Sequence, residues 1–112
     1  MSAEKNLPAG STAMLLMKLL EREDMYGYQM IEELRRRSDH TFDLKAGTLY
    51  PLLHTLEQKG YITAWEEQAA GRPRRYYHLT DQGKKQLRRQ EEDWRGYARG
   101  VTLVLEGGAG LA

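Results

Sequence analysis

The sequence contains no cysteine among its 112 residues, which excludes disulfide bonds and metal sites built on thiolates. It also lacks a long apolar run. The longest, residues 13–20, is interrupted by Lys18 and is far shorter than the ~20 residues of a membrane-spanning helix. The first ten residues, MSAEKNLPAG, have no apolar segment of signal-peptide length. We therefore expect a soluble cytoplasmic protein without membrane association.

An excess of charge is missing as well, because 17 Lys and Arg residues face 16 Asp and Glu residues. A basic surface can then arise only by segregation along the chain. Such segregation exists, since seven basic residues and a single acid, Asp81, lie between Arg72 and Arg89. This segment is a candidate contact for a polyanion.

Catalytic and metal-binding groups do not gather in the sequence. His40, His54 and His78 lie far apart without the spacing of metal ligands. The glycine-rich residues 107–110 precede no helix and therefore do not form a phosphate loop. The sequence predicts neither an enzyme nor a cofactor or metal site.

Hydrophobic periodicity predicts two helices in the first third of the chain. Ser11 or Thr12 can cap a helix that runs to about Arg22, and its nearly encircling apolar side chains predict burial on two sides. A second helix is expected over Tyr26–Arg37. The alternating residues Phe42–Leu44 favour a short strand.

A third helix is expected to begin within residues 46–48 and to end at Gly60, with Pro51 tolerated near its first turn. One face is apolar and consists of Leu49, Leu52, Leu53 and Leu56. At ~100° per residue, the opposite face carries no long charged side chain. That face consists of Gly47, Tyr50, Pro51, His54, Thr55 and Gln58.

Two strands, Tyr61–Glu67 and Arg74–Leu79, are expected to form a hairpin around QAAGRP. Thr80 can cap a fourth helix, with Asp81 in its electropositive first turn. Steps of four and three along this helix define a heptad seam. The seam consists of Leu87, Glu91, Trp94, Ala98, Val101 and Leu105.

These elements predict a mainly α fold with a small β-hairpin, namely a winged helix-turn-helix plus a C-terminal dimerisation helix. We expect a flexible arm at 1–10, a DNA-binding domain at 11–80, the dimerisation helix at 81–106 and a flexible tail at 107–112. A chain of this length forms one domain that is only marginally stable alone, which is consistent with pairing to a second copy.

The segment GRPRR raises two alternatives, a solvated hairpin turn or a wing that touches DNA. Gly71 permits a tight turn and Pro73 keeps the chain extended, so Arg72 and Arg74 can project as planar cations suited to phosphate or a narrow minor groove. One of the following tyrosines should face the core and the other the wing surface. The uncharged face of the preceding helix favours DNA contact.

Several segments occur together at a fixed spacing: YGY at 26–28, KAGTLYPLL at 45–53, LE at 56–57, GYI at 60–62, GRPRRYY at 71–77 and LT at 79–80, followed by Gly83. In combination they resemble the PadR family of bacterial transcriptional regulators. The resemblance covers about residues 12–105, and the combination of GTLYPLL with GRPRRYYHLT is specific to it.

The resemblance implies a homodimeric winged-helix repressor of the short subfamily, in which the first and last helices form the dimer. Such regulators often control their own operon or efflux and detoxification genes. Some bind flat aromatic drugs in a pore between the subunits, where a tryptophan that Trp94 matches by position stacks on the ligand. This chain departs from those members at Gly96 and Gly100 and in its glycine-rich end.

We predict that the DNA-binding residues are Tyr28, Lys45, Gly47, Thr48, Tyr50, Pro51, His54, Arg72, Arg74, Arg75 and Tyr77. The alternatives are simple packing for Tyr28, an easier turn into the helix for Gly47, and an ordinary exposed helix face for the others on the third helix. A run of cations on the fourth helix could widen the footprint or merely be a solvated face. That run is Lys84, Lys85, Arg88 and Arg89.

We predict that the dimer interface and ligand site comprise Met14, Met17, Trp94, Tyr97, Ala98, Val101 and Leu105. Trp94 can serve as a dimer-core residue, as a platform for a small aromatic or phenolic inducer, or as both. The leading hypothesis is a ligand-responsive repressor that binds a pseudo-palindromic operator in double-stranded DNA as a homodimer. The alternative is a winged-helix module that binds protein without DNA.

Overall fold

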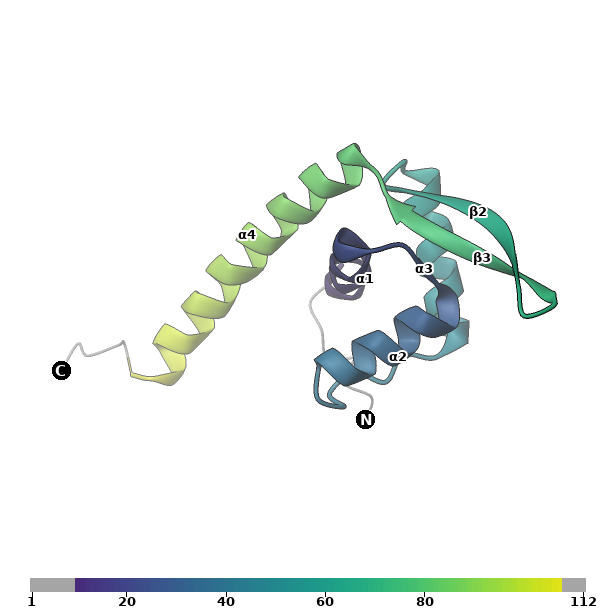
Figure 1. Cartoon of the computed structure of the whole chain (residues 1–112). Helices are drawn as coiled ribbons and strands as arrows, with labels where there is room; N and C mark the ends of the chain where they lie inside the picture. The colour runs from purple at the N-terminus through teal and green to yellow at the C-terminus, as the bar shows by residue number, and fades with distance from the viewer. Residues whose placement is uncertain (1–9, 108–112) are drawn as a thin grey trace.

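The computed structural model describes residues 10–107 and confirms the predicted mainly α fold with a winged helix-turn-helix (Figure 1). In chain order the elements are α1 Ser11–Arg22, β1 Met25–Tyr26, α2 Gly27–Arg37, α3 Ala46–Gln58, β2 Ile62–Ala69, β3 Arg72–Leu79 and α4 Asp81–Leu105. Apart from Gly10 and Gly107, the expected arm and tail lie outside these described residues. Within them, no helix combines the length and apolar character needed to cross a membrane.

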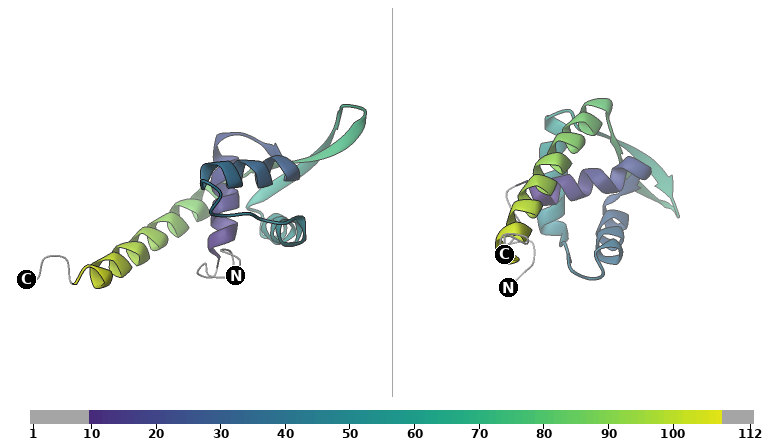
Figure 2. Two further views of the ribbon diagram at one scale, coloured as in Figure 1. Left: turned by 90° about the horizontal axis from the view of Figure 1, so that it is seen from below. Right: turned by 90° about the vertical axis from the view of Figure 1, so that its left-hand side faces the viewer.

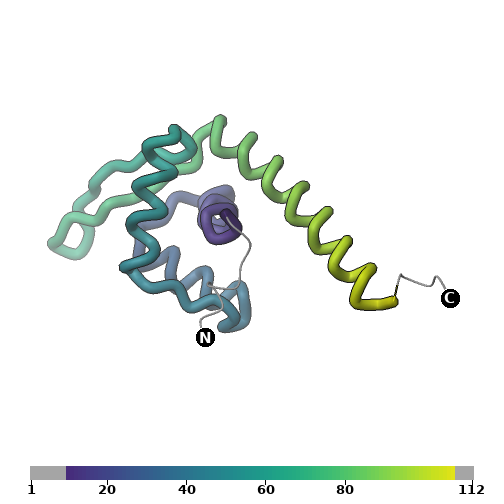
Figure 3. The backbone as a smooth tube through the Cα atoms, turned by 180° about the vertical axis from the view of Figure 1, so that it is seen from behind, coloured from purple at the N-terminus to yellow at the C-terminus, as the bar shows by residue number. Residues whose placement is uncertain are grey.

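Helix α1 lies at the centre of the body, within an arc formed by α2, α3 and α4 (Figure 3). Its side chains Leu16 and Met17 are completely buried, and both belong to one core shared with α2, α3 and the sheet. This burial corrects the prediction for Met17. Met17 was predicted to lie in the dimer interface because the apolar surface of α1 nearly encircles the helix. The core of the same chain buries this side chain completely, so it is not available to a partner.

The sheet has three strands in the order β1-β3-β2, and the strand predicted at Phe42–Leu44 is wrong. Met25 and Tyr26 instead pair with Tyr77 and Tyr76 of β3. Residues 42–45 form an irregular connection whose alternation comes from packing, because Leu44 is buried in the core and Phe42 packs partly against it.

The hairpin is longer than the sequence indicates, and its turn is confined to Ala70 and Gly71. Both residues have positive φ angles, 51° and 80°, as a two-residue hairpin loop of matching twist requires. Arg72 and Pro73 therefore belong to β3, and the paired strands extend to Ala69 opposite Arg72.

The two predicted helix caps differ in outcome. Gly10, in the left-handed region, precedes α1, and no side chain caps this helix, so the expectation for Ser11 and Thr12 is wrong. Thr80 caps α4 as predicted, since its hydroxyl oxygen accepts a hydrogen bond from the Gly83 amide at 3.0 Å.

Helix α4 gives the molecule an elongated shape of 63 × 30 × 21 Å. Its first half packs against α1, where Leu87 is fully buried and Glu91 forms an ion pair with Lys18 at 3.1 Å. Its second half projects away from the body, in the direction opposite to the hairpin tip (Figures 1 and 2). Within residues 10–107, the heptad positions Val101 and Leu105 are therefore exposed.

Candidate nucleic-acid interface

The exposed face of α3 forms the first part of the candidate site. All six residues predicted for this face are exposed: Gly47, Tyr50, Pro51, His54, Thr55 and Gln58. The opposite side of the helix is held by the buried Leu49, Leu53 and Leu56. Thr48 is half-buried at the flank, and Lys45 is exposed at the N-cap position of the helix. The exposed face of α3 therefore carries no long charged side chain and is open to a large partner.

Tyr50 also has a structural role that the sequence interpretation missed. Its hydroxyl lies so close to Gly27, at the start of α2, that a Cβ atom there would sit 2.2 Å away. The pair fixes the approach of α3 to α2 while 47 % of Tyr50 stays exposed. The segment YGY at 26–28 was the available signal, because a glycine at the start of a helix permits close approach.

The three wing arginines have different surroundings. Arg72 is exposed beside the turn, faces Ala69 across the hairpin, and has no hydrogen-bond or ion-pair partner among residues 10–107. The Arg74 guanidinium lies 4.5 Å from the centre of the Tyr26 ring, a cation–π geometry that holds it against the sheet. Arg74 is therefore half-buried and does not project from the tip as expected.

The third arginine joins the wing to α3. Arg75 Nη2 donates to both Glu57 carboxylate oxygens, at 3.1 and 3.4 Å. Both side chains remain partly exposed. Arg75 thus lies beside the C-terminal end of α3, and a carboxylate occupies the position where a phosphate was expected.

The prediction for Tyr77 is wrong, because this side chain is 4 % exposed and belongs to the core. Burial raises the pKa of its hydroxyl, which stays protonated. Strand alternation puts Tyr76 on the outer sheet surface instead, stacked on Trp65 with ring centroids 5.7 Å apart. Tyr26 meets the edge of Tyr76 at 5.4 Å, so one aromatic row crosses all three strands.

The N-terminal end of α3 carries a second ion-pair cluster. Lys45 Nζ lies 3.1 Å from Asp43 Oδ2, and Arg35 Nη2 lies 3.5 Å from the other Asp43 oxygen. The hydrogen bond from Lys45 lowers the pKa of Asp43 from its usual value, so the carboxylate is ionised at neutral pH. At the start of α2, Tyr28 is 63 % exposed, which favours the contact role over the packing alternative.

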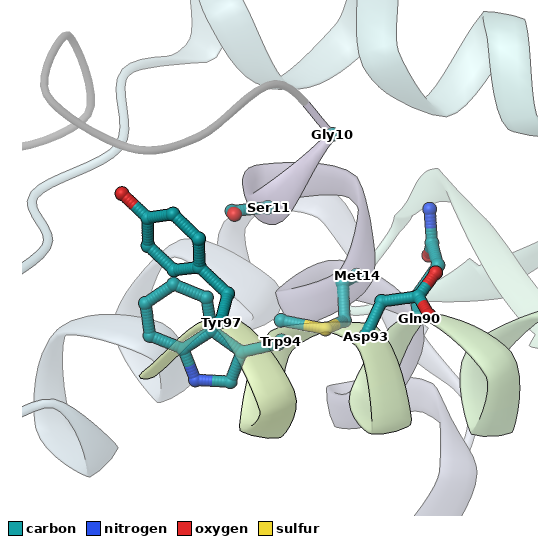
Figure 4. Close-up of a pocket in the computed structure, with 7 residues that line it drawn as sticks. All are labelled: Gly10, Ser11, Met14, Gln90, Asp93, Trp94 and Tyr97. Atoms are coloured by element: carbon teal, nitrogen blue, oxygen red, sulfur yellow. The ribbon is translucent and has the colours of Figure 1, made fainter. Parts of the chain in front are cut away.

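Three of the predicted interface residues, Met14, Trp94 and Tyr97, meet where α1 faces α4 (Figure 4). Trp94 and Tyr97 stack with centroids 5.6 Å apart, and Met14 of α1 lies beside them. A cavity of about 240 Å³ opens here, lined by Gly10, Ser11, Met14, Gln90, Asp93, Trp94 and Tyr97. Gln90 Oε1 is buried against this cavity without a hydrogen-bond partner among the described residues.

The remaining interface residues lie further along α4. Ala98 is half-buried, Val101 is 38 % exposed and Leu105 is 78 % exposed. The cations Lys84, Lys85, Arg88 and Arg89 are all exposed on the first half of the helix. Across residues 10–107, no group of three or more side chains is arranged to hold a metal ion.

Known proteins are similar to this chain in both sequence and architecture. A crystal structure of a PadR family transcriptional regulator from Eggerthella lenta is 37 % identical, with a TM-score of 0.76 over 88 % of this chain and 84 % of that one. A transcriptional regulator from Clostridium thermocellum has a TM-score of 0.78 at 28 % identity, covering 83 % of this chain and 91 % of that one.

Sequence comparison gives the same assignment. A transcriptional regulator of Mycobacterium tuberculosis is 34 % identical over 84 residues, which are 75 % of this chain and 73 % of that protein. The model of the transcriptional regulator PadR-like family matches residues 16–89, which include the α3 face and the wing described above. The chain therefore belongs to the PadR-like family of transcriptional regulators.

Proposed function

We propose that this regulator is a ligand-responsive repressor that binds a pseudo-palindromic operator as a homodimer. Residues 11–80 form the DNA-binding unit, and residues 81–106 form the dimerisation helix. The exposed α3 face enters the major groove and discriminates sequence, while Arg72 contacts the backbone or the minor groove beside it. Tyr28 reaches a flanking phosphate, and Lys45 lies beside the duplex at the N-terminal end of α3.

The observation that carries the DNA-binding part is the α3 face itself. A helix with an open face that lacks long charged side chains, beside an arginine-bearing hairpin, matches the geometry with which winged helices enter the major groove. A surface that only binds protein has no need of an unpaired arginine at the hairpin tip. This arrangement favours DNA contact over the protein-binding alternative.

The dimer is supported by α4. Val104 and Leu105 are 79 % and 78 % exposed, and Tyr97 is 57 % exposed, so this helix presents apolar surface that one chain leaves in water. A second copy supplies an apolar surface of the same kind through a two-fold axis. Two α3 helices related by that axis would read half-sites about 34–36 Å apart.

An inducer is supported by the cavity between α1 and α4. Its stacked Trp94 and Tyr97 rings suit a small aromatic or phenolic molecule. The proposed dimer has two arrangements, one that fits the operator and one that does not. A ligand in the cavity controls DNA binding only if it binds these two arrangements with different affinity. Because α4 leads directly to the wing through Thr80, a change in its direction would move both recognition helices.

The test is fluorescence anisotropy with duplex DNA from upstream of the protein's own gene, measured across a salt series. We expect salt-sensitive binding that is tighter for this DNA than for a random-sequence pool. Arg72→Ala should weaken binding roughly tenfold at ~0.1 M salt and reduce the slope of log K against log salt by about 0.9, the value for one phosphate contact.

Arg99→Ala is the matched control, because it removes the same charge from an exposed position on the second half of α4, the half that projects away from the hairpin tip (Figure 1). It should retain the salt slope of the unmodified protein. If neither DNA binds at ~50 mM salt, where phosphate contacts are strongest, the repressor proposal fails and the protein-binding alternative gains support.

A further inference from the structure

We infer that Asp43 and Glu57 act as electrostatic masks that hold down the sequence-independent affinity of this protein for DNA. The inference rests on the proposed function, in which the exposed α3 face and the wing approach the duplex. Each carboxylate neutralises a cation at one end of α3, and Arg72 is left as the wing cation available to phosphate.

The first mask lies at the C-terminal end of the recognition helix. Glu57 holds Arg75 at 3.1 Å through a nitrogen that spans both carboxylate oxygens. The hairpin register also puts a second acid, Glu66, directly opposite Arg75 on the neighbouring strand. Arg75 is nevertheless 47 % exposed, so it would be accessible to a phosphate if Glu57 were absent.

The second mask lies at the N-terminal end of the same helix. Asp43 divides its two oxygens between Lys45 at 3.1 Å and Arg35 at 3.5 Å. Lys45 is 73 % exposed and occupies the N-cap position, where unpaired helix amides already attract phosphate. An unmasked lysine here would strengthen that attraction for any DNA sequence.

These pairs contribute little to folding, since ion pairs exposed to water are weak. Their effect on a polyanion is different. Sequence-independent binding comes almost entirely from cations that displace condensed counterions. A phosphate that takes Arg75 from Glu57 leaves that carboxylate unpaired close to the duplex, so the gain and the repulsion largely cancel. The ion pairs therefore reduce the number of cations that can displace counterions from DNA, while the cationic side chains themselves stay in place.

The arrangement around Arg74 completes the pattern. Glu67 lies opposite Arg74 in the hairpin, and the Arg74 guanidinium is held over Tyr26. Arg72 is the wing arginine that has an alanine opposite it in the hairpin register. The chain thus confines strong phosphate contact to the tip of the wing and leaves sequence reading to the uncharged α3 face.

The test measures binding of a random-sequence duplex pool by the full chain across a salt series, for Glu57→Gln and for Asp43→Asn. Each variant unmasks one cation, since Arg35 keeps its second partner Glu32 at 3.1 Å when Asp43 is changed. The slope of log K against log salt should therefore steepen by about 0.9 in each. Affinity for the pool should rise roughly fifteenfold at ~50 mM salt and roughly fourfold at ~200 mM, since the added contact consists mainly of counterion release.

Glu92→Gln is the matched control, because Glu92 is an exposed acid of the same charge on α4, a helix that packs mainly against α1. Its salt slope should equal that of the unmodified protein. In the double variant Glu57→Gln/Arg75→Ala, the gain of Glu57→Gln should disappear, which assigns the gain to Arg75. Thermal melts check that each variant is folded.

The outcomes separate the two proposals. If the unmodified protein binds DNA with a salt-dependent affinity but Glu57→Gln and Asp43→Asn behave as Glu92→Gln does, masking is wrong while the repressor proposal stands. If all three acid variants tighten binding equally, net charge alone explains the effect and masking is again wrong. If the unmodified protein and the variants bind no DNA even at ~50 mM salt, both proposals fail.

Discussion

Gly83 lies where the first turn of α4 passes over the backbone of Tyr61. A Cβ atom at this position would be 2.1 Å from the Tyr61 carbonyl oxygen and 2.6 Å from a methyl of Leu79. The backbone carbonyl cannot swing aside as the end of a side chain can. Glycine is therefore the residue that allows α4 to begin so close to the base of the wing.

We predict that Gly83→Ala lowers the free energy of unfolding by about 2 kcal/mol, although alanine is the better helix former by about 1 kcal/mol. Urea denaturation followed by circular dichroism measures the change. Gly47→Ala is the matched control, because a Cβ there meets no atom within 4 Å, and its stability should stay the same or rise. Equal stability of the two variants would contradict the steric argument.

At the residue scale, the sequence predicts whether a side chain is exposed better than it predicts which residue that side chain contacts. The exposure of Tyr50 and His54 followed from helical periodicity alone. The pairing of Arg75 with Glu57 depends on strand register and on how α3 docks against the sheet, and neither is encoded locally. The same holds for Tyr77, since a one-residue shift in register reverses which of two adjacent tyrosines is buried.

At the scale of elements, Thr80 connects the wing, the end of α3 and the start of α4. Its hydroxyl donates to the Gly60 carbonyl at 2.7 Å and accepts from the Gly83 amide at 3.0 Å. Its own amide donates to the Tyr61 carbonyl at 3.0 Å. One residue thus sets the direction in which α4 leaves the DNA-binding unit.

We predict that Thr80→Ala costs about 1–2 kcal/mol of stability, as loss of an N-cap oxygen does. Amide hydrogen exchange should accelerate first in the opening turn of α4, because the Gly83 amide loses its acceptor there. Thr80→Ser keeps the oxygen and should remain within about 0.5 kcal/mol of the unmodified protein. Uniform acceleration across α1 and α3 in Thr80→Ala would show general destabilisation and no specific capping role.

Elements with a long regular pattern were predicted closely, and short ones were not. The apolar periodicity of α3 and the cap of α4 gave their bounds to within a few residues. The strand expected at Phe42–Leu44 failed because three alternating residues do not distinguish a strand from a loop packed on the core. The two-residue strand Met25–Tyr26 has no signal of its own and exists because β3 offers it a free edge.

At the scale of the whole molecule, the heptad seam of α4 has two parts, one covered within the chain and one exposed. Leu87 and Glu91 are engaged within the chain, by the core and by Lys18 respectively. Val101 and Leu105 continue the same seam along the second half of α4, where the described residues 10–107 leave them 38 % and 78 % exposed. The sequence shows the seam but cannot show where this division falls, because it depends on the length of α1.

The exposed part of the seam is where we expect the second copy to bind. Val101→Glu/Leu105→Glu puts two charges on the uncovered seam and should raise the dissociation constant of the dimer by roughly two to three orders of magnitude, as measured by sedimentation equilibrium. The DNA-binding unit should stay folded, because its core lies outside this half of α4. Operator affinity should fall with the dimer, since each half-site is then bound separately.

Arg99→Glu makes the comparison strict. It changes the net charge by the same two units on the same helix, but ~100° steps put it on the side opposite Val101 and Leu105. Any loss of DNA affinity caused by added negative charge alone appears in both variants, whereas loss of the dimer appears only in the seam variant. A seam variant that remains dimeric would show that α4 is not the dimerisation helix and that two-fold operator reading requires another interface.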